Sequence, residues 1–205
     1  MSQLYQVIMT AKELRIIENE QQEFNASLDL ETDRGCCLMA SSYLEYQLEN
    51  ILKKRLVDNE SIHEKLFGFN GPLGTFSSKI EMAYAFGLIA PKAKQDLNLI
   101  RKIRNEFAHD HRLLTFADKP MCDFIDNFYY NTPGKKKGQH RHNFILTVVG
   151  VFSIIIGQRL SIEHIEENVD IVFDSLIISA IQKMQDLKAK GIITGLIAPE
   201  TKDEL

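Results

Sequence analysis

The stretch that decides the fold runs from residue 92 to residue 109 and reads KAKQDLNLIRKIRNEFAH. Its apolar residues recur every three or four positions, which predicts a helix over residues 92–108 whose buried face consists of Ala93, Leu97, Ile100, Ile103 and Phe107. Polar residues follow the same spacing on another face, at Asn98, Arg101, Asn105 and His109. The stretch therefore predicts an amphipathic helix with one buried side and one polar edge, and Asn98 and Arg101 on that edge are candidate binding residues.

The rest of the chain shows similar periodicity, and its sequence lacks the sustained alternation of half-buried strands. We expect further helices over residues 10–24, 29–58, 61–66, 75–87, 118–128, 144–160 and 165–187. Asp29 is expected to cap the second of them, and Ser78 with Glu81 to form a capping box in the fourth. The pattern predicts an all-α, single-domain bundle of about seven to eight helices.

Composition fits an ordinary globular domain, with 24 Lys+Arg, 28 Asp+Glu and 44% hydrophobic residues in a chain of 205. We divide it into an N-terminal helix and lead-in (1–28), a bundle core (29–191) and a tail (192–205). Three cysteines without C-x-x-C spacing exclude a disulfide framework and a cysteine zinc site, so we expect reduced, buried thiols. We expect no metal and no cofactor.

The N-terminus lacks the basic start and apolar run of a signal peptide. The most apolar stretch, residues 144–156, is too short to span a bilayer and is typical of a buried helix. We therefore expect a cytoplasmic protein without a membrane partner.

The segment 68–74 reads GFNGPLG and is the most glycine-dense part of the chain. Such a loop ahead of a helix can bind phosphate through free backbone N–H groups. The spacing and the Lys-Ser/Thr ending of a P-loop are absent, so we favour a structural turn.

Two charged clusters are candidate binding sites. Residues 131–142 contain four cations and no acid, namely Lys135, Lys136, Lys137 and Arg141, and could bind an anion, RNA or an acidic protein; a solvated loop is the alternative. Glu31, Asp33 and Arg34 fall within one turn at a helix start. They could form a binding site, although a capping network is the favoured interpretation.

Three stretches carry a resemblance to a known family: ETDRG (31–35) leading into ASSYL (40–44), GPLGTFS (71–77) leading into AYAFGLI (83–89), and DLNLIRKIRNEFAH (96–109). Together they resemble the mannitol operon repressor family. The resemblance implies a compact all-helical bacterial protein, associated with repression of a sugar-alcohol operon but without a recognisable helix-turn-helix. We therefore expect a transcriptional regulator that acts through protein partners or an atypical nucleic-acid surface.

Direct DNA binding by a helix-turn-helix over residues 83–98 is disfavoured by the formal net charge of −4, because neutralising phosphates requires basic residues. A shorter stretch, RNEFAH (104–109), resembles the HEPN ribonuclease motif. That resemblance implies RNA cleavage by Arg104 and His109 with Asn105 orienting them, in a metal-independent endoribonuclease or an inactive relative. Residues five apart on a helix diverge by about 140°, so Arg104 and His109 share a face only if the helix ends or bends between them.

Both resemblances imply a homodimer. The last predicted helix carries Ile171 and Ile178 outside its main apolar stripe, and we take that side as the candidate interface.

Overall fold

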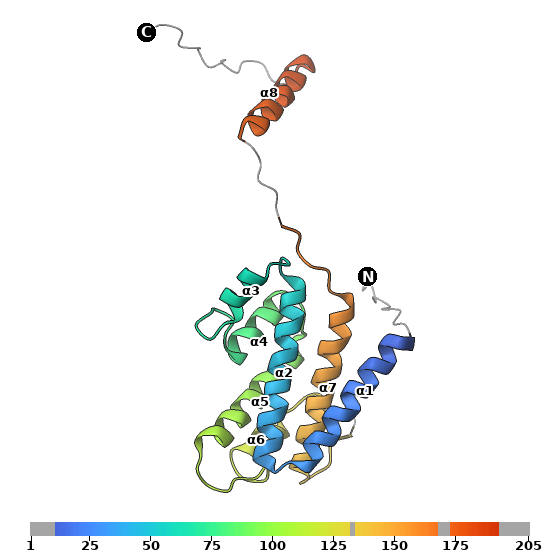
Figure 1. Ribbon diagram of the computed structural model, residues 1–205, viewed down its shortest axis with the longest axis vertical. Coiled ribbons are helices and arrows are strands. Elements are labelled where there is room, and N and C mark those ends of the chain that lie inside the picture. The colour runs from blue at the N-terminus through green and yellow to red at the C-terminus, as the bar shows by residue number, and fades with distance from the viewer. Residues whose placement is uncertain (1–10, 132–133, 168–172, 193–205) are drawn as a thin grey trace. The chain divides into compact units, whose positions relative to one another are not determined.

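The all-α prediction is confirmed by the computed structural model, which describes residues 11–131, 134–167 and 173–192 and contains no strand among them (Figure 1). Its helices are α1 (Ala11–Leu30), α2 (Asp33–Arg55), α3 (Glu60–Phe67), α4 (Phe76–Ala85), α5 (Pro91–His109), α6 (Met121–Asp126), α7 (His140–Ser161) and α8 (Phe173–Ala189). Contacts divide the chain into two units, Met1–Glu166 with α1 to α7 and Glu167–Leu205 with α8.

Helix α2 is the centre of the first unit, because it contacts α1, α4, α5 and α7. Helices α1, α2 and α7 lie side by side along the bundle, while α4 and α5 cover the other side of α2 (Figure 1). The short α6 bridges α5 and α7. This arrangement leaves the start of α4 and the outer edge of α5 next to α2, and the candidate site lies there.

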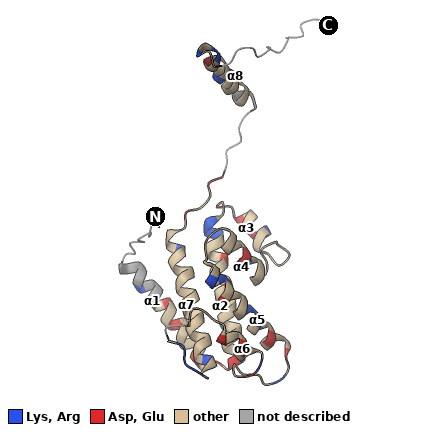
Figure 2. Cartoon of the chain, turned by 180° about the vertical axis from the view of Figure 1, so that it is seen from behind, with Lys and Arg blue, Asp and Glu red and all other residues tan. Residues whose placement is uncertain are grey.

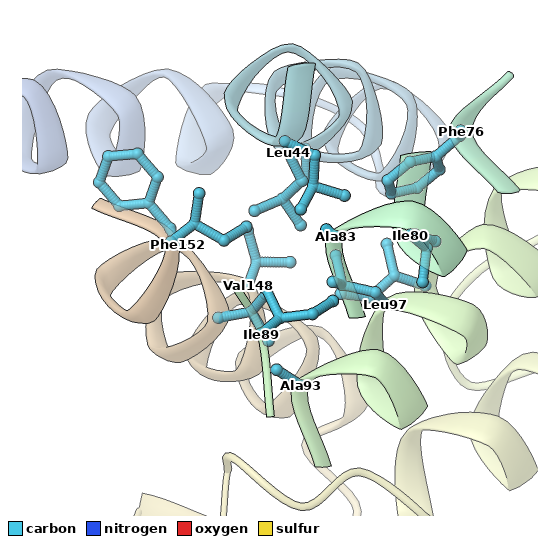
Figure 3. Close-up of a cluster of buried hydrophobic side chains, with 14 of the residues drawn as sticks. Leu44, Phe76, Ile80, Ala83, Ile89, Ala93, Leu97, Val148 and Phe152 are labelled. Carbon is cyan, nitrogen blue, oxygen red and sulfur yellow. The ribbon is translucent and has the colours of Figure 1, made fainter. Parts of the chain in front are cut away.

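The core is formed where α2, α4, α5 and α7 meet. Leu44, Ile80, Leu97 and Val148 come from these four helices in turn, and each is completely buried (Figure 3). Burying one such side chain contributes about 1.5–3 kcal/mol. The predicted inner face of α5 is confirmed, since all five of its apolar residues have no exposed surface.

Helix α7 corrects one premise of the sequence analysis. It has 22 residues and is long and apolar enough to cross a membrane by length and composition alone. Its only charged residues are Arg141 and Arg159, near its two ends, and the middle of the helix is tan in Figure 2. Eight of its residues are nevertheless buried, and it packs against α1, α2, α5 and α6. The length argument was wrong, and the interpretation as a buried core helix is confirmed.

The boundary between the first two helices also differs from expectation. Asp29 does not cap α2, because α1 continues to Leu30. The cap is Thr32, whose side-chain hydroxyl accepts a hydrogen bond from the backbone N–H of Gly35 at 3.1 Å. Threonine in this position satisfies one of the unpaired N–H groups in the first turn of the helix.

Three other local predictions were wrong. The capping box of α4 pairs Thr75 with Ser78, not Ser78 with Glu81. Helix α7 starts at His140, so Arg141 belongs to a helix and not to a loop. Cys36 and Cys37 are buried as expected, but Cys122 is only half-buried.

The last helix begins later than predicted. Residues 162–167 are not helical, and the backbone N–H of Ile165 donates to the carbonyl of Arg55 at 2.9 Å. Helix α8 starts at Phe173, and Ile171 lies outside the described residues.

Candidate functional site

Part of the predicted polar edge of α5 lines a cavity of about 310 Å³ where α2, α4 and α5 meet. Helix α5 contributes Arg101, Arg104 and Asn105, and α2 contributes Glu45. The start of α4 supplies the remaining lining, residues 74–77. The cavity thus joins three predicted site residues to a helix N-terminus that sequence reasoning had not connected with them.

The glycine-dense loop brings α4 to this place. The backbone N–H groups of Gly71, Leu73 and Gly74 donate to carbonyls of the same region at 2.8–3.0 Å, so they are not free to bind phosphate. A Cβ atom on Gly71 or Gly74 would overlap backbone carbonyl oxygens. The loop is the structural turn we favoured, and only glycine allows it to close this tightly.

The two arginines of the cavity pair with neutral groups only. Arg101 donates to the side-chain oxygen of Asn98 at 3.4 Å, and Arg104 donates to that of Asn105 at 3.2 Å. Within the described residues, neither guanidinium forms an ion pair with a carboxylate. Two positive charges therefore face the cavity without local compensation.

The carboxylate of the cavity is already paired. Glu45 lies 3.0 Å from the ammonium of Lys79, which also lies 2.9 Å from Glu49. Burial alone would lower the pKa of Lys79, but the hydrogen bonds that its ammonium donates to Glu49 and Glu45 outweigh burial and raise this pKa above its usual value. Lys79 therefore stays charged and neutralises Glu45, so the cavity keeps a positive character.

His109 does not join this site. Helix α5 runs without a break to His109, so the side chains of Arg104 and His109 point about 140° apart. Arg104 lines the cavity, whereas His109 is exposed in the last helical position. The bend that would bring the pair onto one face within a single chain is absent from α5, and the ribonuclease hypothesis stays a prediction.

The second predicted cluster ties distant segments together. Arg141 contacts Asp33 through Nη1 and Oδ1 at 2.5 Å, and it donates to the carbonyls of Leu28 and Glu31 at 2.8 and 2.7 Å. Arg34 donates to the carbonyls of Asp110 and Arg112 at 2.8 and 2.7 Å. The turn between α1 and α2 is thereby joined to α7 and to the loop after α5.

The other basic residues of the 131–142 segment are more exposed. Lys135 donates to the carbonyl of Asp126 at 2.8 Å, while Lys136 and Lys137 extend into solvent. No group of three or more His, Cys, Asp or Glu residues in the described ranges could hold a metal ion.

The residues that would face DNA in a helix-turn-helix make contacts within the fold instead. Lys94 pairs with Glu81 at 2.6 Å, and Lys92 lies 5.2 Å from the centre of the Tyr129 ring. Gln95 donates to the carbonyl of Asn127 at 3.4 Å. This start of α5 is therefore used to hold α4 and the segment after α6.

Sequence reasoning missed Glu45, Lys79 and residues 75–77 as neighbours of the α5 edge. The hydroxyl-rich TFSS stretch directly after the glycine loop was the available signal, since such residues begin helices. Its distance from Arg101 could not be read from the chain order.

A family model described as mannitol repressor matches residues 26–148, which include every residue that lines the cavity. The chain belongs to the mannitol repressor family. The predicted role as a transcriptional regulator is thereby confirmed, and so is the resemblance on which it was based. A similar solved structure is the MtlR–HPr complex from Escherichia coli, with a TM-score of 0.54 and 20% identity over 71% of this chain and 99% of that chain. At this identity the likeness shows a shared fold. No curated protein matches this chain.

Proposed function

We propose that this protein controls a sugar-alcohol operon by binding a protein partner and not through a DNA-reading helix. The family match over residues 26–148 carries the proposal. The internal contacts of Lys92, Lys94 and Gln95 support it, because the helix that would read DNA is engaged within the bundle.

HPr is the partner to test first. The solved MtlR with the same fold is in complex with HPr, and this chain covers 99% of that MtlR. Almost the whole of that solved MtlR therefore has a structural counterpart in this chain.

The surface that best fits a protein partner lies beside α3. A groove of about 590 Å³ there is lined by the carboxylates of Glu49, Asp58, Glu60 and Glu64, together with Lys53 and His63. Next to it, Phe69 is 97% exposed in the glycine loop. An exposed aromatic side chain at the edge of an acidic groove suits a partner with an apolar contact and a basic rim.

A binding assay tests the partner proposal. Purified full-length protein is titrated with HPr from the same source, beside Phe69→Ser and Leu113→Ser variants. Both side chains are almost completely exposed, and the loops after α3 and after α5 lie toward opposite ends of the bundle (Figure 1). We expect binding by the wild type and by Leu113→Ser, and at least about tenfold weaker binding by Phe69→Ser. No binding by the wild type would refute HPr as the partner.

An operon reporter tests the regulatory proposal separately. Expression of the sugar-alcohol operon is measured in a strain that lacks this chain, with and without complementation. We expect expression to rise on deletion and to fall on complementation. Unchanged expression of the neighbouring sugar-alcohol genes contradicts control of such an operon.

We infer further that the protein is bacterial and cytoplasmic, where a regulator meets the chromosome, and that it forms a homodimer. The exposed apolar residues of α8 support the homodimer, namely Leu176, Ile177, Ile178, Ile181 and Met184. Ile177, Ile181 and Met184 are spaced so that they share one side of the helix, and an exposed apolar side is typical of an interface between subunits.

A further inference from the structure

We propose that the cavity between α2, α4 and α5 is a binding site for a small phosphate ester, with Arg101 and Arg104 as the residues that hold its phosphate. This inference concerns a ligand site on the purified chain and does not depend on partner binding or on operon control. The site and its ligand class follow from the charges that line the cavity.

The arginine pair is the main observation. Arg101 and Arg104 are one helical turn apart on α5, and both line the cavity. Their observed partners are the neutral side-chain oxygens of Asn98 and Asn105, at 3.2–3.4 Å. These contacts are long for a guanidinium, which forms shorter and stronger hydrogen bonds with phosphate oxygens.

The part of the cavity lining that belongs to α4 favours the same ligand. Helix α4 starts at Phe76, and the N–H groups of its first turn have no carbonyl partner within the helix, although that of Ser78 donates to the side chain of Thr75. The partial positive charge of that helix end adds to the charges of the two arginines. Ser77 lines the wall beside them and supplies a hydroxyl donor.

Glu45 is the one acidic side chain among the residues that line the cavity. Its carboxylate also lines the cavity, but the ammonium of Lys79 lies 3.0 Å away and compensates for it. Glu45 can accept hydrogen bonds from hydroxyl groups on the remainder of a ligand. A volume of about 310 Å³ is larger than free phosphate requires and suits a phosphorylated polyol or sugar.

Calorimetric titration of the full-length protein tests the site. Glucose 6-phosphate is the probe, glucose is its uncharged match, and inorganic phosphate is titrated separately. We expect saturable binding of the phosphate ester and none of glucose. Arg101→Gln and Arg104→Gln are each expected to weaken binding at least about tenfold, because each variant loses one charge-assisted hydrogen bond to the phosphate.

Lys102→Gln is the matched control. Lys102 lies on the same helix, is exposed and loses the same charge, but it does not line the cavity. Thermal melting of every variant confirms that the fold is intact. Equal binding of inorganic phosphate would identify free phosphate as the source of the ligand group and would support the site.

Three results overturn the proposal. One is the absence of binding by glucose 6-phosphate and by inorganic phosphate at millimolar concentration. Another is an equal loss of binding in Lys102→Gln, which indicates general surface charge. The third is binding of a single-stranded RNA oligomer that depends on the two arginines while both phosphate probes fail.

Discussion

Arg141 and Asp33 form an ion pair with Nη1 and Oδ1 2.5 Å apart, although 108 residues separate them in the chain. Asp33 also accepts a hydrogen bond from the backbone N–H of Phe116 at 2.9 Å. One carboxylate at the start of α2 therefore holds the first turn of α7 and the loop after α5. Arg141 was singled out in the sequence as part of a basic binding segment, and the structure shows it bonded within the fold.

Arg141→Gln is expected to lower the free energy of unfolding by about 1–3 kcal/mol, because it removes an ion pair and two hydrogen bonds that are only partly exposed. Denaturation in urea measures this change. Lys137→Gln is the control from the same segment, since Lys137 is exposed. Equal stability of the two variants would contradict a structural role for Arg141.

Lys79→Met is expected to lower the free energy of unfolding by about 1–3 kcal/mol, because it leaves Glu45 and Glu49 close together without their shared cation. Lys53 also contacts Glu49, at 2.6 Å, but its side chain is 38% exposed, and Lys53→Met is expected to cost less than about 1 kcal/mol. Thermal or chemical unfolding ranks the two variants. A larger loss of stability in Lys53→Met than in Lys79→Met contradicts the role of Lys79 as the shared cation of Glu45 and Glu49.

The loss of folding stability caused by Lys79→Met is expected to depend on pH. Burial would raise the pKa of Glu49, but hydrogen bonds from Lys53 and Lys79 lower it below the ordinary value of 4.5. The unfolded chain therefore binds the Glu49 proton more readily, and this contribution to stability is lost as the pH falls below about 4.5. The raised pKa of Lys79 keeps its contribution present up to its ordinary value of 10.5. A difference between wild type and variant that grows on acidification would be inconsistent with these shifts.

The three cysteines are expected to react at different rates with a thiol reagent at mildly alkaline pH. Burial raises the pKa of Cys36 to about 11 and raises that of Cys37 further, so both thiols stay protonated and inaccessible. Cys122 is half-buried and is expected to react first. Absorbance after addition of the reagent should show one fast thiol, which Cys122→Ser removes. Rapid labelling of Cys36 or Cys37 in the folded protein contradicts this order.

The proposed homodimer is expected to depend on α8. Ile181 is 48% exposed on the apolar face of that helix, and Ile181→Asp should shift the mass measured by light scattering from dimer to monomer. Ser179→Asp introduces the same charge on the side of the helix that points away from Ile181, and it should leave the dimer intact. A wild type that is monomeric at micromolar concentration, or an Ile181→Asp variant that stays dimeric, argues against this interface.

Local sequence patterns were sufficient to predict the features that depend on the spacing of apolar residues. The stripe from Ala93 to Phe107 is the buried face of α5, as predicted. The predicted helix starts were wrong where a side chain other than the expected one capped the N-terminus of the helix. Thr32 begins α2 and Thr75 begins α4, because the choice between neighbouring capping residues depends on where the preceding turn delivers the chain.

The amino-acid order alone determined the helical class, the buried face of α5 and membership of the family, because each rests on residues that lie near one another along the chain. Tertiary packing decided which charges meet. It brought Arg101 and Arg104 to the same cavity as the start of α4, and it paired Arg141 with Asp33. Such pairs form only after helices distant in sequence have buried their apolar faces together, since the hydrophobic packing sets the distance and angle at which polar groups at the edges can bond.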